Sequence, residues 1–228
     1  MKKFMNSKKG LSLGVLALTA SLAVGSAMAY FTDTDHAENQ ITIGKVDIDL
    51  EEKEWDKLTP EEKTDITPNK EITKDPQVTN IGINDAFVFV TVEVPVADVI
   101  TANDDGTKNP KAVTELFSWK TNEGWTRFGE VKDVTNEVGV VLAHEYSYVY
   151  GTDSTCTALK KGVATPKLFN SVKFANVIEG QTMADGTLLE EKTLNINLKA
   201  YGIQTTDLTE KDVTDPASVW QVLSNQTK

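Results

Sequence analysis

The chain has 228 residues, of which 34 are acidic and 23 basic, and its net charge at pH 7 is −11. An acidic surface repels nucleic acid and anionic lipid, so the sequence predicts neither as a direct partner. The single cysteine, Cys156, also excludes an intrachain disulfide.

The first 29 residues follow the order of a secretory signal peptide. Four lysines precede an apolar run from Leu11 to Val24, and small residues end the segment at Ala27 and Ala29. A short apolar helix followed by an A-x-A triplet is typical of a signal-peptidase substrate. We therefore expect signal peptidase as a partner, cleavage after Ala29, and Tyr30 as the first mature residue. The alternative is an uncleaved anchor, because this stretch approaches the ~20 residues that a membrane-spanning helix needs.

Cleavage would leave residues 30–228, which we expect to form one secreted domain. Without the four lysines, 19 basic residues remain against 34 acidic ones, and the net charge becomes −15. No second long apolar stretch follows, so we expect no stable membrane span after cleavage. Export without a disulfide is typical of Gram-positive bacteria. The predicted location is extracellular, in association with the cell surface.

Residues 30–50 predict an N-terminal leader strand. Ile41 and Ile43 share one parity, whereas Val46, Ile48 and Leu50 share the other. A change of phase by one residue, at Gly44-Lys45, is typical of a β-bulge, which glycine permits.

Alternating apolar residues predict most of the remaining elements as strands. The charged stretch 51–63 predicts only a short surface helix or a loop. Residues 86–94 carry apolar side chains on one face and two phenylalanines on the other, which indicates a central strand covered on both sides. The same alternation predicts strands over 138–150, 168–174 and 194–200. Turn-forming clusters separate these segments, so we expect an all-β, antiparallel sandwich.

The C-terminal segment predicts a short helix over residues 215–224. Asp215 followed by Pro216 is an N-cap and first-turn pair. Val219, Trp220, Val222 and Leu223 then form an apolar stripe, which we expect to pack on the sandwich.

No catalytic residue, metal ligand set or cofactor site emerges from the sequence. His144-Glu145 resembles the start of H-E-x-x-H, but Tyr148 stands where the second histidine should be, and the only other histidine is His36. We expect His144 to be a partly buried strand residue. Cys156 has no neighbouring base in the sequence. Residues 103–106 resemble part of a calcium loop whose first ligand is replaced by a threonine, so we expect an Asn/Asp turn.

Several phrases together resemble the TasA/camelysin family of exported bacterial proteins, whose export depends on a dedicated signal peptidase. They are Lys8–Gly14, the junction Ala29–Asp33, Ile43–Leu50, the turn Val78-Thr79-Asn80-Ile81-Gly82, and Ala200–Gln204 followed by Asp215–Leu223. The resemblance implies a jelly-roll-like β-sandwich. It also implies a role in extracellular biofilm fibres or in a cell or spore surface layer, with related matrix proteins as further partners.

In filament-forming relatives the new N-terminus is understood to insert as a strand into the next subunit. The corresponding anchors here are Tyr30, Phe31, Ile41 and Ile43. Head-to-tail donation does not close on itself, so it generates a filament. The alternatives are that these residues complete their own domain, or that residues 30–39 have no fixed structure.

The sequence therefore favours a secreted, non-enzymatic structural protein that self-assembles by strand addition. One alternative is a monomeric surface adhesin in which residues 100–128, with Trp119 and Trp125, form a recognition surface. Core packing of both tryptophans is the competing interpretation. The third hypothesis is a camelysin-like metallopeptidase.

Overall fold

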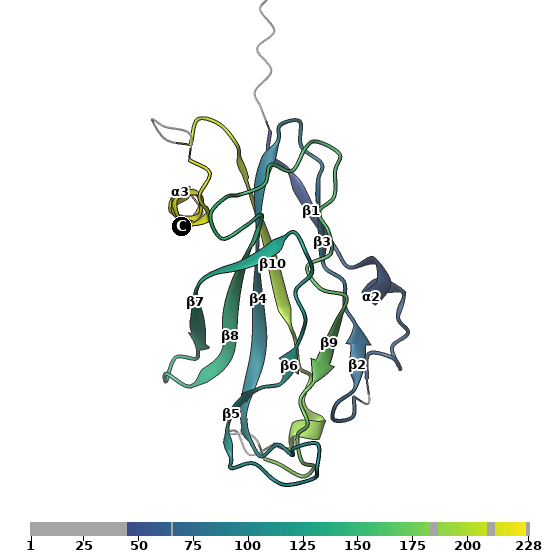
Figure 1. The fold of residues 1–228 in the computed structure, drawn as a ribbon. Coiled ribbons are helices and arrows are strands. Elements are labelled where there is room, and N and C mark those ends of the chain that lie inside the picture. The colour runs from purple at the N-terminus through teal and green to yellow at the C-terminus, as the bar shows by residue number, and fades with distance from the viewer. Residues whose placement is uncertain (1–44, 65, 183–186, 209–212, 227–228) are drawn as a thin grey trace, which may run out of the picture. The chain divides into compact units, whose positions relative to one another are not determined.

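A computed structural model describes residues 45–64, 66–182, 187–208 and 213–226. Every strand pairing in these residues is antiparallel, and two layers of strands face each other (Figure 1). The larger layer has the order β10-β4-β8-β7, with β5 also paired to β4, and the opposing layer consists of β1-β3 and β2-β9-β6. The predicted antiparallel β-sandwich is confirmed. The strands are β1 (Ile48–Glu51), β2 (Glu71–Thr73), β3 (Gln77–Asn80), β4 (Ala86–Val99), β5 (Ala112–Glu115), β6 (Phe117–Ser118), β7 (Trp125–Thr135), β8 (Val141–Tyr150), β9 (Ser171–Phe174) and β10 (Asn197–Gln204).

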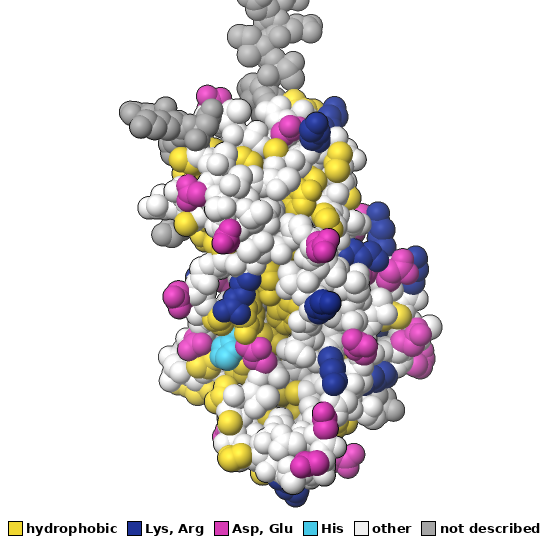
Figure 2. All heavy atoms as spheres, in the orientation of Figure 1, with side chains coloured by type: hydrophobic (Ala, Val, Ile, Leu, Met, Phe, Trp, Pro, Cys, Tyr) yellow, Lys and Arg dark blue, Asp and Glu magenta, His cyan; other side chains and the backbone are white. Residues whose placement is uncertain are grey.

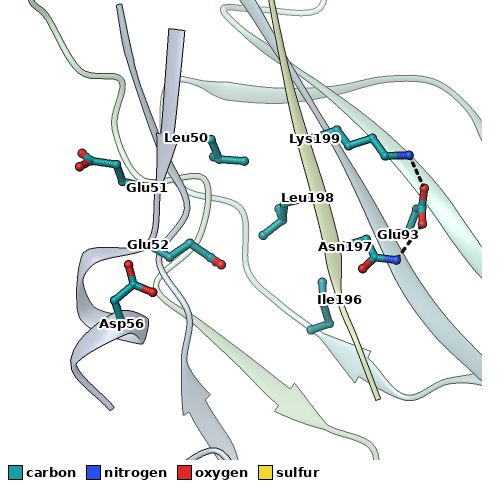
Figure 3. A pocket seen from close by; sticks show the side chains of 9 residues that line it. All are labelled: Leu50, Glu51, Glu52, Asp56, Glu93, Ile196, Asn197, Leu198 and Lys199. Carbon is teal, nitrogen blue, oxygen red and sulfur yellow. Dashed lines mark hydrogen bonds and ion pairs between the residues drawn. The ribbon is translucent and has the colours of Figure 1, made fainter. Parts of the chain in front are cut away.

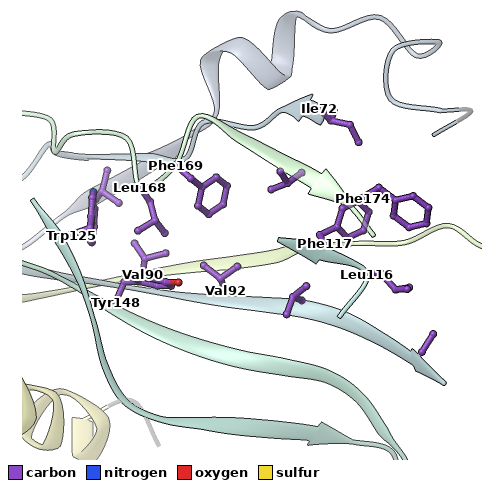
Figure 4. Close-up of a cluster of buried hydrophobic side chains, with 14 of the residues drawn as sticks. Ile72, Val90, Val92, Leu116, Phe117, Trp125, Tyr148, Leu168, Phe169 and Phe174 are labelled. Carbon is purple, nitrogen blue, oxygen red and sulfur yellow. The ribbon is translucent and has the colours of Figure 1, made fainter. Parts of the chain in front are cut away.

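Strand β4 is the centre of the larger sheet, as its sequence predicts. It has 14 residues and pairs with β10 on one side and β8 on the other. Its inward valines are buried in the core between the two layers, against Leu168, Phe169 and the pair Phe117–Phe174, whose ring centroids lie 5.4 Å apart (Figure 4). Apolar burial on this scale is the main favourable term in folding.

Helix α3 (Pro216–Gln226) covers part of the opposite face of β4. Val219 and Leu223 are buried against Phe87 and Phe89, and the ring of Trp220 lies 5.2 Å from that of Phe89. The Asp215 carboxylate accepts the N–H of Ser218 at 2.9 Å, which is the predicted N-cap. The C-terminal helix is therefore confirmed.

Three predicted strands begin later than the sequence indicates, and one of them is β9, which starts at Ser171 and not at residue 168. Strand β8 starts at Val141, because Val138 and Val140 belong to the turn that joins it to β7. The Asn136 side chain accepts the N–H groups of both valines, at 3.1 and 2.9 Å, and this local bonding replaces ladder bonds. Strand β10 starts at Asn197, although the alternation begins at Leu194.

The charged stretch after β1 contains a short helix, α2 (Lys53–Lys57), one of its two predicted forms. Its first N–H groups, those of Glu54 and Trp55, donate to the carboxylate of Asp75, which is 2 % exposed. Lys167 Nζ lies 3.0 Å from the same carboxylate. Burial alone would raise the pKa of Asp75, but the N–H donors and the Lys167 ammonium together hold it below its ordinary value.

We predict that Asp75→Asn lowers the free energy of unfolding by about 3 kcal/mol at pH 7, because it leaves Lys167 unpaired and weakens the helix cap. The folded-state pKa of Asp75 is lowered, so its stabilising effect is complete above pH ~4 and is lost as pH falls through the lowered pKa. Urea unfolding of both proteins at several pH values measures this. The exposed Asp56→Asn is the control. A difference between wild type and Asp75→Asn that did not change with pH would contradict the assignment.

Candidate functional site

The side of β10 that faces away from β4 pairs with no other strand among the described residues. Ala86 of β4 exchanges both of its backbone hydrogen bonds with Leu159, at 3.0 and 2.8 Å, so its polar groups point away from β10. Because antiparallel pairs alternate, the next residue, Phe87, bonds to Ile203 of β10. The residues between the bonded positions of β10 therefore direct N–H and C=O groups outward. They are Leu198, Ala200, Gly202 and Gln204.

The segment Thr193–Ile196 extends this edge without any pairing. Leu194 and Ile196 are half-buried, whereas Thr193 and Asn195 are exposed, as in a strand with one covered face. Among the described residues, no backbone hydrogen bond joins these four residues to another part of the chain. We call residues 193–204 the open edge. An extended segment with unpaired backbone groups is a template for another strand.

A first pocket, of about 550 Å³, opens between β1 and the open edge (Figure 3). Leu50 and Leu198 point toward each other across it, with Ile196 beside them. Its rim is mostly acidic and consists of Glu51, Glu52, Asp56, Glu93 and Lys199. The hydrogen bond from Asn197 and, after it, the Lys199 ammonium hold the pKa of Glu93 below its ordinary value, although burial opposes them.

Glu52 leaves one acceptor unused at the wall of this first pocket. Its Oε2 pairs with Lys74 Nζ at 2.8 Å. Its Oε1 is buried and has no hydrogen-bond partner among the described residues. Buried polar atoms are normally bonded, so this oxygen is an exception among the described residues, as is Thr91 Oγ1.

A second pocket, of about 490 Å³, lies where the open edge begins. Ile178 lines this pocket, and its N–H donates to the carbonyl of Ile100, just beyond the end of β4, at 3.0 Å. The pocket is lined by the apolar residues Ile66, Phe117, Phe174, Val177, Ile178, Leu189 and Leu194. It carries charges of both signs, on Lys63, Glu179, Glu190, Glu191 and Lys192. The two pockets thus follow each other along the chain from Leu189 to Lys199.

The described chain begins at the other end of β4, where the turn Val78–Gly82 holds Lys45 and Asp47. The N–H of Gly82 donates to the Asp47 carbonyl at 2.9 Å, and that of Ile83 donates to the Lys45 carbonyl at 3.1 Å. A Cβ atom on Gly82 would lie 2.6 Å from the Lys45 carbonyl oxygen, so only glycine allows this approach. We call residues 45–47 the leader root.

Asn80 fixes the same turn from within. Its side chain is fully buried; Oδ1 accepts the N–H of Gly82 at 3.0 Å, and Nδ2 donates to the carbonyls of Asn84 and Leu159 at 2.9 and 2.8 Å. This is the physical reason for asparagine and glycine in the V-x-N-x-G phrase.

The residues predicted for cleavage and strand donation lie outside the described part of the chain. They are Ala27, Ala29, Tyr30, Phe31, Ile41 and Ile43, and Gly44 of the predicted bulge is also outside it. The pockets, Glu52 and the unpaired Thr193–Ile196 were missed from sequence. Their only sequence signal is the alternation over 194–200.

His144 lies in β8 and is partly buried, as predicted. Its Nδ1 is 2.7 Å from Glu115 Oε1, and its Nε2 is 3.6 Å from Asp133 Oδ1, so the two carboxylates lie on different sides of the ring. Figure 2 shows the histidine with acidic side chains on either side of it. A metal at either nitrogen would meet only one of these carboxylates, which does not fit a zinc centre. The described residues contain no group of three or more His, Cys, Asp or Glu placed to hold a metal ion.

Tyr146 joins this network by donating its hydroxyl hydrogen to Glu115. Burial, and then the Glu115 carboxylate, raise the pKa of Tyr146 to about 12. The network links β5 to β8, and nothing in it supplies an activated nucleophile.

The two tryptophans considered as recognition residues serve packing. Trp125 is buried and donates Nε1–H to the Pro166 carbonyl at 2.8 Å. Trp119 donates to the Tyr148 hydroxyl at 3.1 Å and packs edge-on against Tyr146. This is the core-packing interpretation of both residues.

Cys156 and the Asn/Asp turn are also structural. Cys156 is buried beneath α3, and burial, with the charge of Asp215 second, raises its pKa to about 12. The predicted turn is closed by the bond from Asn103 N–H to the Thr107 carbonyl, at 2.8 Å, and by Asp105, whose carboxylate accepts the Thr107 N–H at 2.9 Å.

A family model described as camelysin metallo-endopeptidase matches residues 6–160, which are 155 of the 228 residues. The chain belongs to the camelysin family. No curated protein and no solved structure matches the chain. The camelysin match includes the leader root, the V-x-N-x-G turn, β4 and the His144 network, whereas the open edge follows it in sequence. No helix in the described part of this camelysin-family chain is long and apolar enough to cross a membrane.

We predict that Asn80→Ala destabilises the fold by about 2–4 kcal/mol, because it removes the three hydrogen bonds that the buried side chain makes to Gly82, Asn84 and Leu159 and leaves a cavity in their place. Thermal unfolding measures this effect. Asn84→Ala is the matched control, since Asn84 contributes only its backbone carbonyl to the turn and its side chain is exposed. Equal effects of the two substitutions would contradict this role of Asn80.

Proposed function

We propose that this protein is a secreted structural component of the extracellular matrix or of a cell or spore surface. In this proposal it assembles into fibres when the leader of one copy adds as a strand to the open edge of the next. The observation that carries the proposal is the unpaired segment Thr193–Ile196, which adjoins two pockets. Membership of the camelysin family supports secretion.

The length of the leader supports its role as the added strand. Residues 30–43 are 14 residues, and the open edge has 12. At about 3.3 Å per residue these are about 46 and about 40 Å long, so one leader can pair along the whole edge. Backbone hydrogen bonds supply affinity in such strand addition, and alternate side chains in pockets supply specificity.

Cleavage after Ala29 acts as the switch in this proposal. A leader attached to a membrane segment cannot enter a neighbouring molecule, whereas a processed leader ends freely at Tyr30. Mass spectrometry of the exported protein tests this step, and a native chain that retained residues 1–29 would contradict it.

We predict that deleting residues 30–40 abolishes fibres. The described fold begins at Lys45, so the deletion variant should remain folded, with an unchanged melting temperature, but should elute as a monomer. Size-exclusion chromatography and electron microscopy of the exported proteins compare it with the full leader. Fibres formed by the deletion variant would show that this segment is not the donor.

We further propose a non-enzymatic role, despite the metallo-endopeptidase description of the family. The His144 geometry supports it, because the neighbouring carboxylates do not converge on one ring nitrogen. Casein incubated with the exported protein should remain intact, with or without zinc or EDTA. Hydrolysis that EDTA abolishes would favour a peptidase.

A further inference from the structure

The leader root and the second pocket lie at opposite ends of β4. The root is bonded to Gly82 and Ile83, immediately before β4 begins at Ala86. The second pocket is level with Ile100, immediately after β4 ends at Val99. Fourteen strand residues separate these points, a distance of about 46 Å.

This separation sets the direction in which a leader can enter a neighbour. When two copies in the same orientation stack end to end along the direction of β4, the leader root of one copy faces the second pocket of the other. The leader residues nearest the root are Ile43 and Ile41, so these reach the pocket first. In an extended strand both side chains point to one side, and Thr42 points to the other.

The lining of the second pocket favours the isoleucines of the leader as its occupants. This pocket has a larger apolar surface than the first pocket, whose rim is mostly acidic. Burying an isoleucine side chain in the second pocket contributes about 1.5–3 kcal/mol.

We infer that the leader of one copy runs antiparallel to β10 of the next, with Ile41 and Ile43 seated in the second pocket. Tyr30 and Phe31 then reach the far end of the open edge, near Gln204. The inference rests on the proposed assembly and deepens it, because it assigns the direction of the added strand, the residues at each of its ends and the pocket that binds it. Antiparallel addition also continues the pairing of the whole sandwich.

Disulfide trapping between two differently tagged, exported chains tests the direction. One chain carries Ile41→Cys and the other Leu194→Cys, so only contact between copies can join them. Cys156 does not compete, because its thiol is buried and its pKa is raised. We expect mixed dimers on non-reducing gels from this pair and from Phe31→Cys with Gln204→Cys. The crossed pair, Phe31→Cys with Leu194→Cys, should give at least about tenfold less.

The outcomes separate this inference from the proposed function. Dimers only from the crossed pair would show parallel addition and overturn the inference, while strand donation would stand. If polymers form but none of the cysteine pairs cross-links, the leader binds elsewhere, and this outcome would also overturn the inference. Absence of polymers in wild-type protein would overturn the proposed function and this inference together.

Single substitutions give a second, independent measurement. Ile43→Asp should raise the critical concentration for assembly by about tenfold or more, because a charge replaces a buried apolar side chain. Thr42→Asp adds the same charge on the other side of the strand and should change the critical concentration by less than about threefold. Equal effects would show that the two sides of the leader are not distinguished, which contradicts seating in the pocket.

Discussion

Burial of β4 on both faces is the constraint on which the rest of the structure depends. A strand with valines on one face and phenylalanines on the other has no side that can face water, so it needs a second sheet on one face and a helix on the other. It also needs a partner along each side, and β8 and β10 fill these places. This leaves β10 as the last strand on its side, and the position of the open edge follows from the burial of its neighbour.

The open edge is only lightly protected against unwanted pairing. Lys199 and Asn197 are tied to Glu93 on one face, and exposed polar residues alternate with the half-buried apolar ones. Soluble β-proteins commonly protect such edges with charges, prolines or covering loops. In the proposed assembly an edge of this kind is retained because the next subunit covers it, and its charged residues select among the strands that approach.

The sequence predicted those elements whose determinants are local. The double-faced apolar pattern of 86–94 located β4, and the Asp215-Pro216 pair located α3. Asn136 shows why strand ends are harder to predict, because one amide side chain removes two valines from the alternating pattern. The cap of α2 comes from Asp75, 21 residues after the Glu54 that it binds, and no local pattern records that pairing. The pockets join segments that only the folded topology brings together, so the alternation over 194–200 predicted a strand but not an acceptor.

The position of Cys156 gives this protein an internal reporter of local opening. The thiol lies under α3, beside Val219 and Leu223, and its own N–H donates to the Thr214 carbonyl at 2.7 Å. A reagent can reach the sulfur only when α3 moves away from the sheet, so the rate of alkylation measures how often this local opening occurs. In the proposed location outside the cell, the same cover keeps oxidants away from the thiol, so one reduced cysteine need not cross-link neighbouring copies.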